Sequence, residues 1–276
     1  MIQPTTPDLL SSSLPVWPTD LPGPPHLKAA FPAALRRVLE VPEVLGVIWA
    51  GSAAGGEADR HSDLDFYTLV SGQERWRMSW VVDGVPVEVF CTSAGWHEKY
   101  AQRQDTSSLA MLLTGRVVLE HPKLLELIEQ ARAVWTTGRT PKVLTLAERH
   151  TLTDAVWEAR SMIGQASYVL ESMSALRALI HALYRVCGWW ETKPMHWTAD
   201  LEKRDPDAAR HLCAALYPVS DKQRQAALEV FALHVLGSLE APESSTERQA
   251  LGQTLILQDP CGGSVRSGPV FFESSG

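Results

Sequence analysis

The segment GSAAGGEADRHSDLDFYTLV, residues 51–70, joins a Gly-Ser turn to two carboxylates at the start of a predicted strand. Residues 45–50, LGVIWA, precede it as a short apolar run typical of a buried strand. Residues 64–70, LDFYTLV, form the second predicted strand. Because side chains alternate along a strand, Asp63 and Asp65 point to the same face. The segment therefore predicts a strand, a glycine turn and a second strand that opens with paired acids.

A hairpin follows this segment directly. Residues 77–82, RMSWVV, and residues 85–90, VPVEVF, are separated by Asp83-Gly84. An Asp-Gly pair between apolar runs is a strong signal for a two-residue hairpin turn. We therefore expect four strands within a short stretch of chain, and hence a small mixed sheet.

Three acids in these strands indicate a metal site. Two carboxylates on one face repel each other unless a cation lies between them, and hard oxygen ligands favour Mg²⁺. Glu88 is flanked by valines in the last strand, where a carboxylate is costly to bury alone. We interpret Asp63, Asp65 and Glu88 as the three ligands. The alternative for Glu88 is a cross-strand ion pair with Arg75 or Arg77.

The turn before the acids has the composition of a phosphate-binding loop. Gly51 would let a phosphate approach the backbone closely, and Ser52 adds a hydroxyl. Gly55 and Gly56 supply the flexibility to return the chain to Ser62. These parts suit metal-assisted phosphoryl chemistry, in which cations clamp the attacking and leaving oxygens in line.

The rest of the chain is expected to be mainly helical, so the fold class is α+β, a small mixed-sheet domain followed by a helical bundle. Thr145 and Glu148 resemble a capping box that opens a long helix towards Glu171. The Gly, Thr and Pro of residues 136–142 indicate a domain boundary. Further helices are predicted over residues 27–40, 97–113, 122–135, 174–187, 206–216 and 220–240. The expected divisions are a flexible lead-in (1–25), a catalytic domain (26–140), a helical substrate-binding domain (141–245) and a loose tail (246–276).

Composition narrows the class of protein. The formal net charge is −7, and residues 1–140 carry 12 Lys and Arg against 16 Asp and Glu, so extended nucleic-acid binding is not expected. A small substrate, including a cationic one, suits this net charge better than a polynucleotide. The N-terminus lacks a secretory signal, and no apolar run is long enough for a membrane span. The four cysteines form no ligand cluster, which favours a reduced, cytoplasmic protein.

The Gly-Ser turn, the ten residues that follow it, the Asp-Leu-Asp of residues 63–65 and the later in-strand Glu88 resemble the nucleotidyltransferase superfamily. That superfamily includes DNA polymerase β, and the layout here is most similar to the bacterial aminoglycoside nucleotidyltransferases. The resemblance implies a magnesium-dependent transfer of a nucleoside monophosphate from a triphosphate such as ATP, with release of pyrophosphate. By the same resemblance Asp63, Asp65 and Glu88 are catalytic metal ligands. Gly51, Ser52 and Ser62 would then contact the nucleotide.

The resemblance continues more weakly beyond the acids. Residues 114–135 look like the strand and helix that close such domains, and the helical second half is similar to the substrate-binding domains of antibiotic nucleotidyltransferases. The segment GWWETKPMHW, residues 188–197, resembles their Lys- and Trp-containing loop, which implies that Lys193 reaches the triphosphate. The acceptor would be a hydroxyl of a small molecule, an aminoglycoside-like compound being one option. Four acids are candidates for the general base that takes the proton of this hydroxyl: Glu88, Glu148, Asp154 and Glu158.

Two other functions compete with this interpretation. Arg204-Asp205 with His211 matches the nominal spacing of a HEPN-type ribonuclease signature, although Pro206 interrupts it. The other alternative is a non-catalytic, antitoxin-like protein that binds nucleotide without turnover. RNA cleavage that persists in EDTA would favour the ribonuclease. Nucleotide binding without pyrophosphate release would favour the binding protein.

Overall fold

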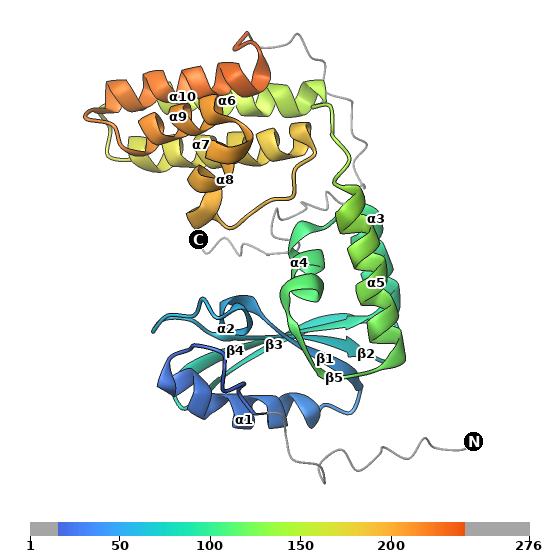
Figure 1. Cartoon of the computed structure of the whole chain (residues 1–276). Coiled ribbons are helices and arrows are strands. Elements are labelled where there is room, and N and C mark those ends of the chain that lie inside the picture. Colours follow the sequence, from blue (N-terminus) through green and yellow to red (C-terminus); the bar gives the residue numbers. More distant parts are fainter. Residues whose placement is uncertain (1–15, 241–276) are drawn as a thin grey trace, which may run out of the picture.

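The computed structural model describes residues 16–240 and shows two lobes, one above the other in Figure 1. A five-stranded sheet with flanking helices builds the first lobe, and helices alone build the second. Residues 138–145 connect them without helix or strand, and the predicted boundary at 136–142 overlaps this connection. The expected α+β class, a mixed sheet followed by a helical part, is confirmed.

The sheet of the first lobe has the strand order β3-β4-β2-β1-β5. β1 is antiparallel to both β2 and β5, β3 and β4 form the predicted hairpin, and β2 runs parallel to β4. Asp83 and Gly84 connect the hairpin with φ values of 49° and 80°, as a primed two-residue turn requires. Because β2 pairs with β4, the second strand of the hairpin lies beside β2, the strand that carries Asp65, and the first strand does not. The strands are β1 (Val44–Ala50), β2 (Leu64–Val70), β3 (Arg75–Val82), β4 (Val85–Ser93) and β5 (Arg116–Leu119).

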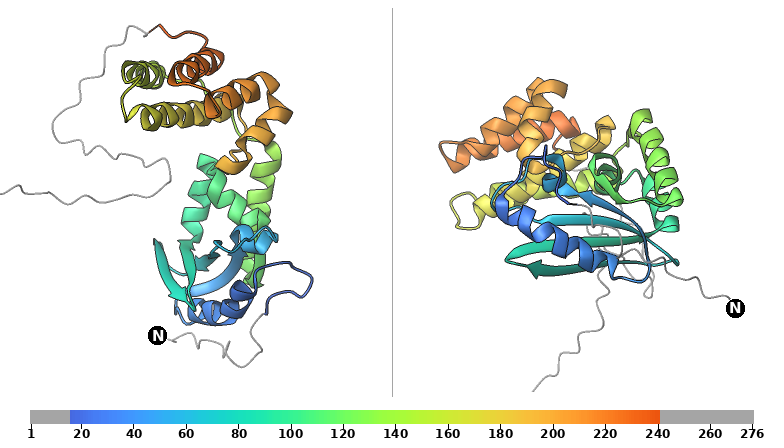
Figure 2. Two further views of the ribbon diagram at one scale, coloured as in Figure 1. Left: turned by 90° about the vertical axis from the view of Figure 1, so that its left-hand side faces the viewer. Right: turned by 60° about the horizontal axis from the view of Figure 1, so that its bottom comes forward.

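Helices cover both faces of this sheet (Figure 2). The helix α1 (Pro25–Leu39) packs Leu27, Phe31 and Leu35 into one core, together with Trp49 and Phe66 of the sheet. The opposite face is covered by α3, α4 and α5, and its core includes Ile48, Tyr67 and Leu124. A short helix, α2 (Gly51–Gly55), follows β1 directly. The remaining bounds are α3 (Ala94–Arg103), α4 (Thr106–Thr114) and α5 (Pro122–Thr137).

The second lobe is organised around α7, which buries one face against its neighbours. Its core is formed by apolar side chains from α6, α7, α9 and α10, with Leu179, Leu212 and Phe231 fully buried. The predicted capping box is present: the Thr145 hydroxyl accepts from the Glu148 amide, and the Glu148 carboxylate accepts from the Thr145 amide. The helices are α6 (Leu146–Ser161), α7 (Tyr168–Cys187), α8 (Trp197–Arg204), α9 (Pro206–Leu216) and α10 (Asp221–Leu236).

Two predicted helices are broken in the structure. The helix expected over 97–113 is divided between α3 and α4, because Gln104 adopts a left-handed φ of 53° and the Asp105 side chain caps α4 by accepting from the Ser108 amide at 2.9 Å. The helix expected to run from Thr145 towards Glu171 ends at Ser161, and Gly164 turns the chain with a φ of 83°. The helical spacing of apolar residues continues across both breaks. The helices end there because local turn and capping interactions compete with the helix.

The predicted flexible lead-in, residues 1–25, is described only from residue 16. Trp17 and Leu21 are buried in the first core, and the Trp17 indole donates to the Leu21 carbonyl at 3.0 Å. The Trp17 ring lies 4.6 Å from that of Trp49. These residues are therefore packed and not flexible, because the aromatic contacts outweigh the Pro-rich composition. The predicted loose tail, residues 246–276, and Cys261 lie outside the described residues.

Candidate active site

Three carboxylates converge at one edge of the sheet. Asp63 immediately precedes β2, Asp65 is its second residue, and Glu88 lies in β4 directly opposite Asp65 in the parallel register. One ligand atom from each of the three lies within 4.8 Å of the others. Opposite ligands of an ion bound at about 2.0–2.6 Å are about 4–5 Å apart, so the three oxygens fit around a single divalent cation. Glu88 therefore lies on the same face of the sheet edge as the Asp pair, as a third ligand of one cation would require.

The electrostatics of Asp65 show an excess of negative charge in this cluster. Burial, which is the largest cause, and the neighbouring carboxylates of Asp63 and Glu88 together raise its pKa from 3.8 to about 6. The positive charges of Lys193 and Arg77 act against this increase without cancelling it. A buried acid that resists ionisation beside two others is stabilised when a cation supplies the missing charge. The donor set, all hard oxygens, fits Mg²⁺.

Arg77 is the counter-ion of Glu88 in the structure. Its guanidinium forms an ion pair with the Glu88 carboxylate and lies 4.7 Å above the Phe90 ring. The Arg77 side chain is 56% exposed, so it can leave Glu88 without unpacking the core. Glu88 thus forms the ion pair with Arg77 and at the same time lies close to Asp63 and Asp65. Glu88 is therefore both a cross-strand partner and a member of the acidic cluster.

Gly51 fits closely against the acidic cluster. It has a φ of 76°, and a Cβ at this position would lie 2.2 Å from Oδ2 of Asp65. A side chain would thus be strained by the backbone and would displace a carboxylate. The glycine after β1 is therefore a requirement of the site as well as of the turn.

Gly51→Ala is expected to lower the free energy of unfolding by about 1–3 kcal/mol, the usual cost of a strained left-handed residue, and to weaken metal binding by moving Asp65. The matched control is Gly55→Ala, since a Cβ there meets no atom within 4 Å. Thermal melting and Mg²⁺ titration of both variants check this. Equal behaviour of the two variants would show that the close approach of Gly51 to Asp65 has no consequence.

The predicted nucleotide-binding serines belong to one hydrogen-bonded turn. The Ser52 hydroxyl donates to the Ser62 hydroxyl at 3.3 Å, and the Ser62 hydroxyl donates to Oδ1 of Asp59 at 3.1 Å. The Asp59 amide in turn donates to the Ser62 hydroxyl at 2.9 Å. These bonds tie the start of α2 to the residue before Asp63. The structure therefore brings Gly51, Ser52 and Ser62 next to the acids.

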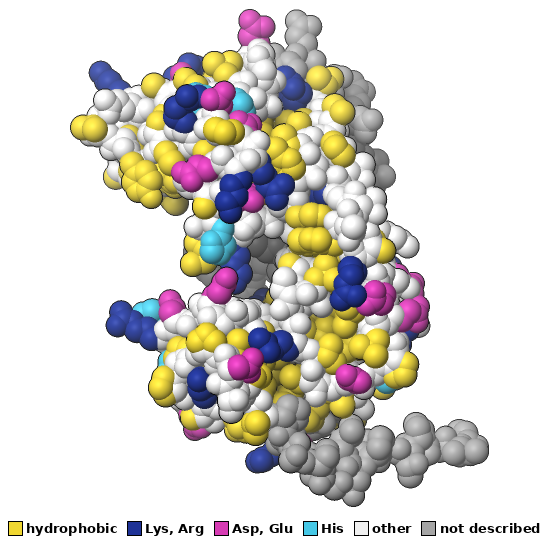
Figure 3. Space-filling view, in the orientation of Figure 1, with side chains coloured by type: hydrophobic (Ala, Val, Ile, Leu, Met, Phe, Trp, Pro, Cys, Tyr) yellow, Lys and Arg dark blue, Asp and Glu magenta, His cyan; other side chains and the backbone are white. Residues whose placement is uncertain are grey.

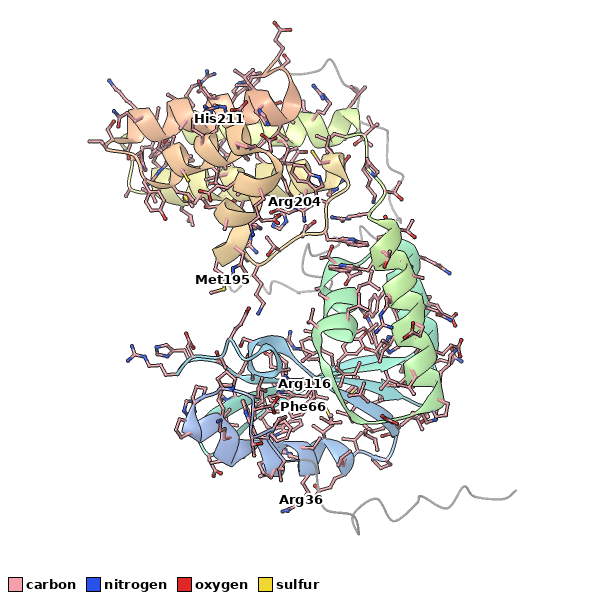
Figure 4. All side chains as sticks on the ribbon, in the orientation of Figure 1. Arg36, Phe66, Arg116, Met195, Arg204 and His211 are labelled. Carbon is pink, nitrogen blue, oxygen red and sulfur yellow. The ribbon has the colours of Figure 1, made fainter. Side chains whose placement is uncertain are left out.

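Lys193 reaches the same region from the second lobe. It lies in the segment between α7 and the short 3₁₀ helix η1 (Pro194–His196), and its charge acts on Asp65. Figure 4 shows the neighbouring Met195 at the tip of the second lobe that points towards the first. Figure 3 shows the hollow between the lobes, with Lys, Arg, Asp and Glu side chains gathered on the face of the second lobe above it. The charge of Lys193 thus acts on the acidic cluster from the second lobe.

The residues of the ribonuclease alternative contact other side chains. Arg204 binds the Asp200 carboxylate at 2.9 Å, and Asp205 caps α9 and contacts Nε2 of His234 at 2.7 Å. Figure 4 places Arg204 on the side of the lobe that faces the hollow and His211 on the opposite side. The His211 ring lies 5.9 Å from that of His234, the partner of Asp205, whereas Arg204 is held by Asp200.

Arg139, His181 and Glu191, which contact one another beside the segment 188–197, were not predicted from the sequence. Glu191 accepts from Arg139 at 2.9 Å and contacts Nδ1 of His181 at 3.0 Å, while Trp190 stacks on Trp135. The only signal for them was the density of aromatic residues in the segment 188–197. A separate depression of about 550 Å³ contains none of the three acids and is lined by residues of α3, α5 and the connection, among them Arg103, Thr137 and Lys142.

Glu148, a candidate general base, has a structural role: its carboxylate completes the capping box and pairs with Arg185.

Cys91, Cys187 and Cys213 are free thiols, as expected for unpaired cysteines. Among residues 16–240, no helix has both the length and the hydropathy needed to cross a bilayer.

Comparison with known proteins gives a likeness in structure but none in sequence. No protein-family model matches the chain, and no curated protein matches it. Among solved structures, it is similar to a nucleotidyltransferase-like protein from Exiguobacterium sibiricum 255-15, with a TM-score of 0.45 and 13% sequence identity. The match covers 76% of this chain and 74% of that one. At this identity and TM-score, the neighbour's function does not transfer to this chain.

Proposed function

We propose that this chain is a nucleotidyltransferase that moves a nucleoside monophosphate from a nucleoside triphosphate, ATP in the first instance, to a hydroxyl of a small acceptor, releasing pyrophosphate. The observation that carries the proposal is the convergence of Asp63, Asp65 and Glu88 beside the Gly51-Ser52 turn. Carboxylates next to a close-approach glycine and paired hydroxyls suit a triphosphate and its cation better than any other ligand class.

Each part of the site then has a role. Asp63, Asp65 and Glu88 would hold Mg²⁺, which neutralises charge on the phosphates and orients them for in-line displacement. The backbone at Gly51 and the hydroxyls of Ser52 and Ser62 would contact phosphate oxygens. Lys193 would add a positive charge from the second lobe, where negative charge develops on the leaving pyrophosphate.

The acceptor would bind in the hollow between the lobes (Figure 3). On this proposal residues 26–140 form the catalytic domain and residues 141–245 the substrate-binding domain. A small hydroxyl compound, aminoglycoside-like molecules included, fits a space that is bordered by both lobes. The acceptor hydroxyl attacks the α-phosphate, pyrophosphate leaves, and the hydroxyl proton passes to a base, for which Glu88 is one candidate in the acidic cluster.

The direct test is pyrophosphate release with each of the four nucleoside triphosphates, Mg²⁺ and a library of hydroxyl acceptors. We expect turnover that requires Mg²⁺, stops with EDTA and is lost in Asp63→Asn. Calorimetry with a non-hydrolysable ATP analogue is run in parallel. Binding of the analogue without release of pyrophosphate under any condition would identify a nucleotide-binding protein, and cleavage of RNA in EDTA would identify a ribonuclease.

A further inference from the structure

The segment Gly188–Lys193, here called the lysine loop, belongs to the second lobe by sequence but docks on the first. The Trp190 ring stacks on the Trp135 ring of α5, with centroids 4.5 Å apart and planes 4° from parallel. The Trp190 indole also donates to the Trp135 carbonyl at 3.1 Å. Both rings pack against the core between the sheet and α3–α5. The loop is therefore fixed to the lobe that carries the acids.

A second anchor fixes the loop to the connection between the lobes. Glu191 accepts from Arg139 at 2.9 Å and contacts Nδ1 of His181 of α7 at 3.0 Å. The Arg139 side chain is only 13% exposed and that of Glu191 26%, so water screens the pair weakly. Burial alone would raise the pKa of Glu191, but the bonds from His181 and Arg139 lower it, so the carboxylate is charged at neutral pH.

The backbone at the start of the loop is equally constrained. Gly188 has a φ of 67°, and a Cβ there would lie 2.6 Å from the Arg139 carbonyl oxygen. The Trp189 amide donates to the Tyr184 carbonyl at 2.9 Å. The chain between α7 and η1 thus has little freedom up to Glu191. Two residues later Lys193 is exposed, and its charge acts on Asp65.

We propose that Trp190 and Glu191 are positioning residues, which hold the lysine loop against α5 and Arg139 so that Lys193 stays over the acidic cluster and binds the triphosphate. The inference rests on the proposed function, since it gives Lys193 a ligand. A lysine side chain at the end of a free loop would lose much conformational entropy on binding a phosphate. Anchors that order the loop beforehand remove part of that cost, and they make the triphosphate site depend on the contact between the lobes.

The test compares Trp190→Ala, Glu191→Gln and Lys193→Met, with Glu229→Gln as the matched control. Glu229 also forms an ion pair, with Arg160, and its side chain is 29% exposed, but it lies in α10, away from the loop. Removing the Lys193 charge is expected to raise the KM for the triphosphate about 10- to 100-fold, as for a charge-assisted hydrogen bond. Each anchor variant should raise the KM in the same direction with a smaller change in kcat. In a Lys193→Met background the anchor variants should add little.

Hydrogen exchange of residues 188–197 in the full chain gives a readout that needs no substrate. Exchange should accelerate in Trp190→Ala and Glu191→Gln, recover in Trp190→Phe, and remain unchanged in Glu229→Gln. Unaltered exchange in both anchor variants would overturn the inference, and so would KM effects that simply add to that of Lys193→Met. If Lys193→Met leaves the KM unchanged while Asp63→Asn abolishes turnover, the positioning role fails and the nucleotidyltransferase proposal stands. If no triphosphate binds the unmodified chain, both fail.

Discussion

Asp65→Asn is expected to abolish nucleotidyl transfer and, in the metal-free protein, to raise the free energy of unfolding at neutral pH. The variant keeps the shape of the side chain but removes a metal ligand, so turnover should fall by at least about 100- to 1000-fold. Asp63→Asn should lose activity in the same way. The gain in stability follows because the carboxylate is buried beside two others, and the amide is not charged.

The effect of Asp65 on the free energy of unfolding depends on pH, and its sign follows from two pKa values. The pKa of Asp65 is about 6 in the folded chain and 3.8 ordinarily, so between these values the folded state binds more protons than the unfolded state. Stability contributed by this proton is present below about pH 4 and is lost as the pH rises through 6. The gap corresponds to on the order of 1–3 kcal/mol. Metal affinity should change in the opposite direction, weakening as the pH falls below 6, because the ion requires the ionised carboxylate.

Chemical denaturation in EDTA at pH 5 and pH 7.5, with pyrophosphate release at saturating Mg²⁺, measures both effects on the same preparations. Asp83→Asn is the control, since it removes one exposed carboxylate from a turn that tolerates Asn at a φ of 49°. Full activity of Asp65→Asn would contradict the proposed mechanism. Loss of stability in EDTA at pH 7.5 would contradict the electrostatic description of the cluster.

Glu88→Gln should reduce turnover by about 100- to 1000-fold, the usual effect of losing a charge that stabilises the transition state, while nucleotide still binds through Asp63, Asp65 and the Gly51 turn. The ion pair with Arg77 allows a matched comparison. Arg77→Gln breaks the same pair but leaves the carboxylate in place, so it should retain turnover and bind Mg²⁺ at lower concentration. The pair is largely exposed and contributes at most about 1 kcal/mol to stability, so both variants should fold.

Kinetics, Mg²⁺ titration and melting are therefore measured together on Glu88→Gln and Arg77→Gln. Parallel phenotypes, with a small loss of stability and unchanged turnover in both, would mean that Glu88 is only the partner of Arg77. The acidic cluster would then lack its third ligand. A large loss of turnover in Glu88→Gln alone would assign the carboxylate to the chemistry.

The local parts of the site could be predicted from the amino-acid sequence alone. The apolar run before Gly51, the alternation that puts Asp63 and Asp65 on one face, and the Asp83-Gly84 hairpin are all short-range patterns, and the structure confirms each of them. Such features depend on backbone preferences and side-chain alternation over a few residues, so they can be read without knowing what packs against them.

Which of these parts lie next to each other depends on the tertiary fold. The hairpin places β4 parallel to β2, which sets Glu88 opposite Asp65, and β3 takes the edge and supplies Arg77. The charge of Lys193 acts on Asp65 from a segment in which Trp190 docks on Trp135, 55 residues away along the chain. Contacts between distant segments depend on how the packed faces of helices and sheets fit together and on the chain entropy lost when a long loop closes. Neither quantity can be predicted from the local pattern of residues.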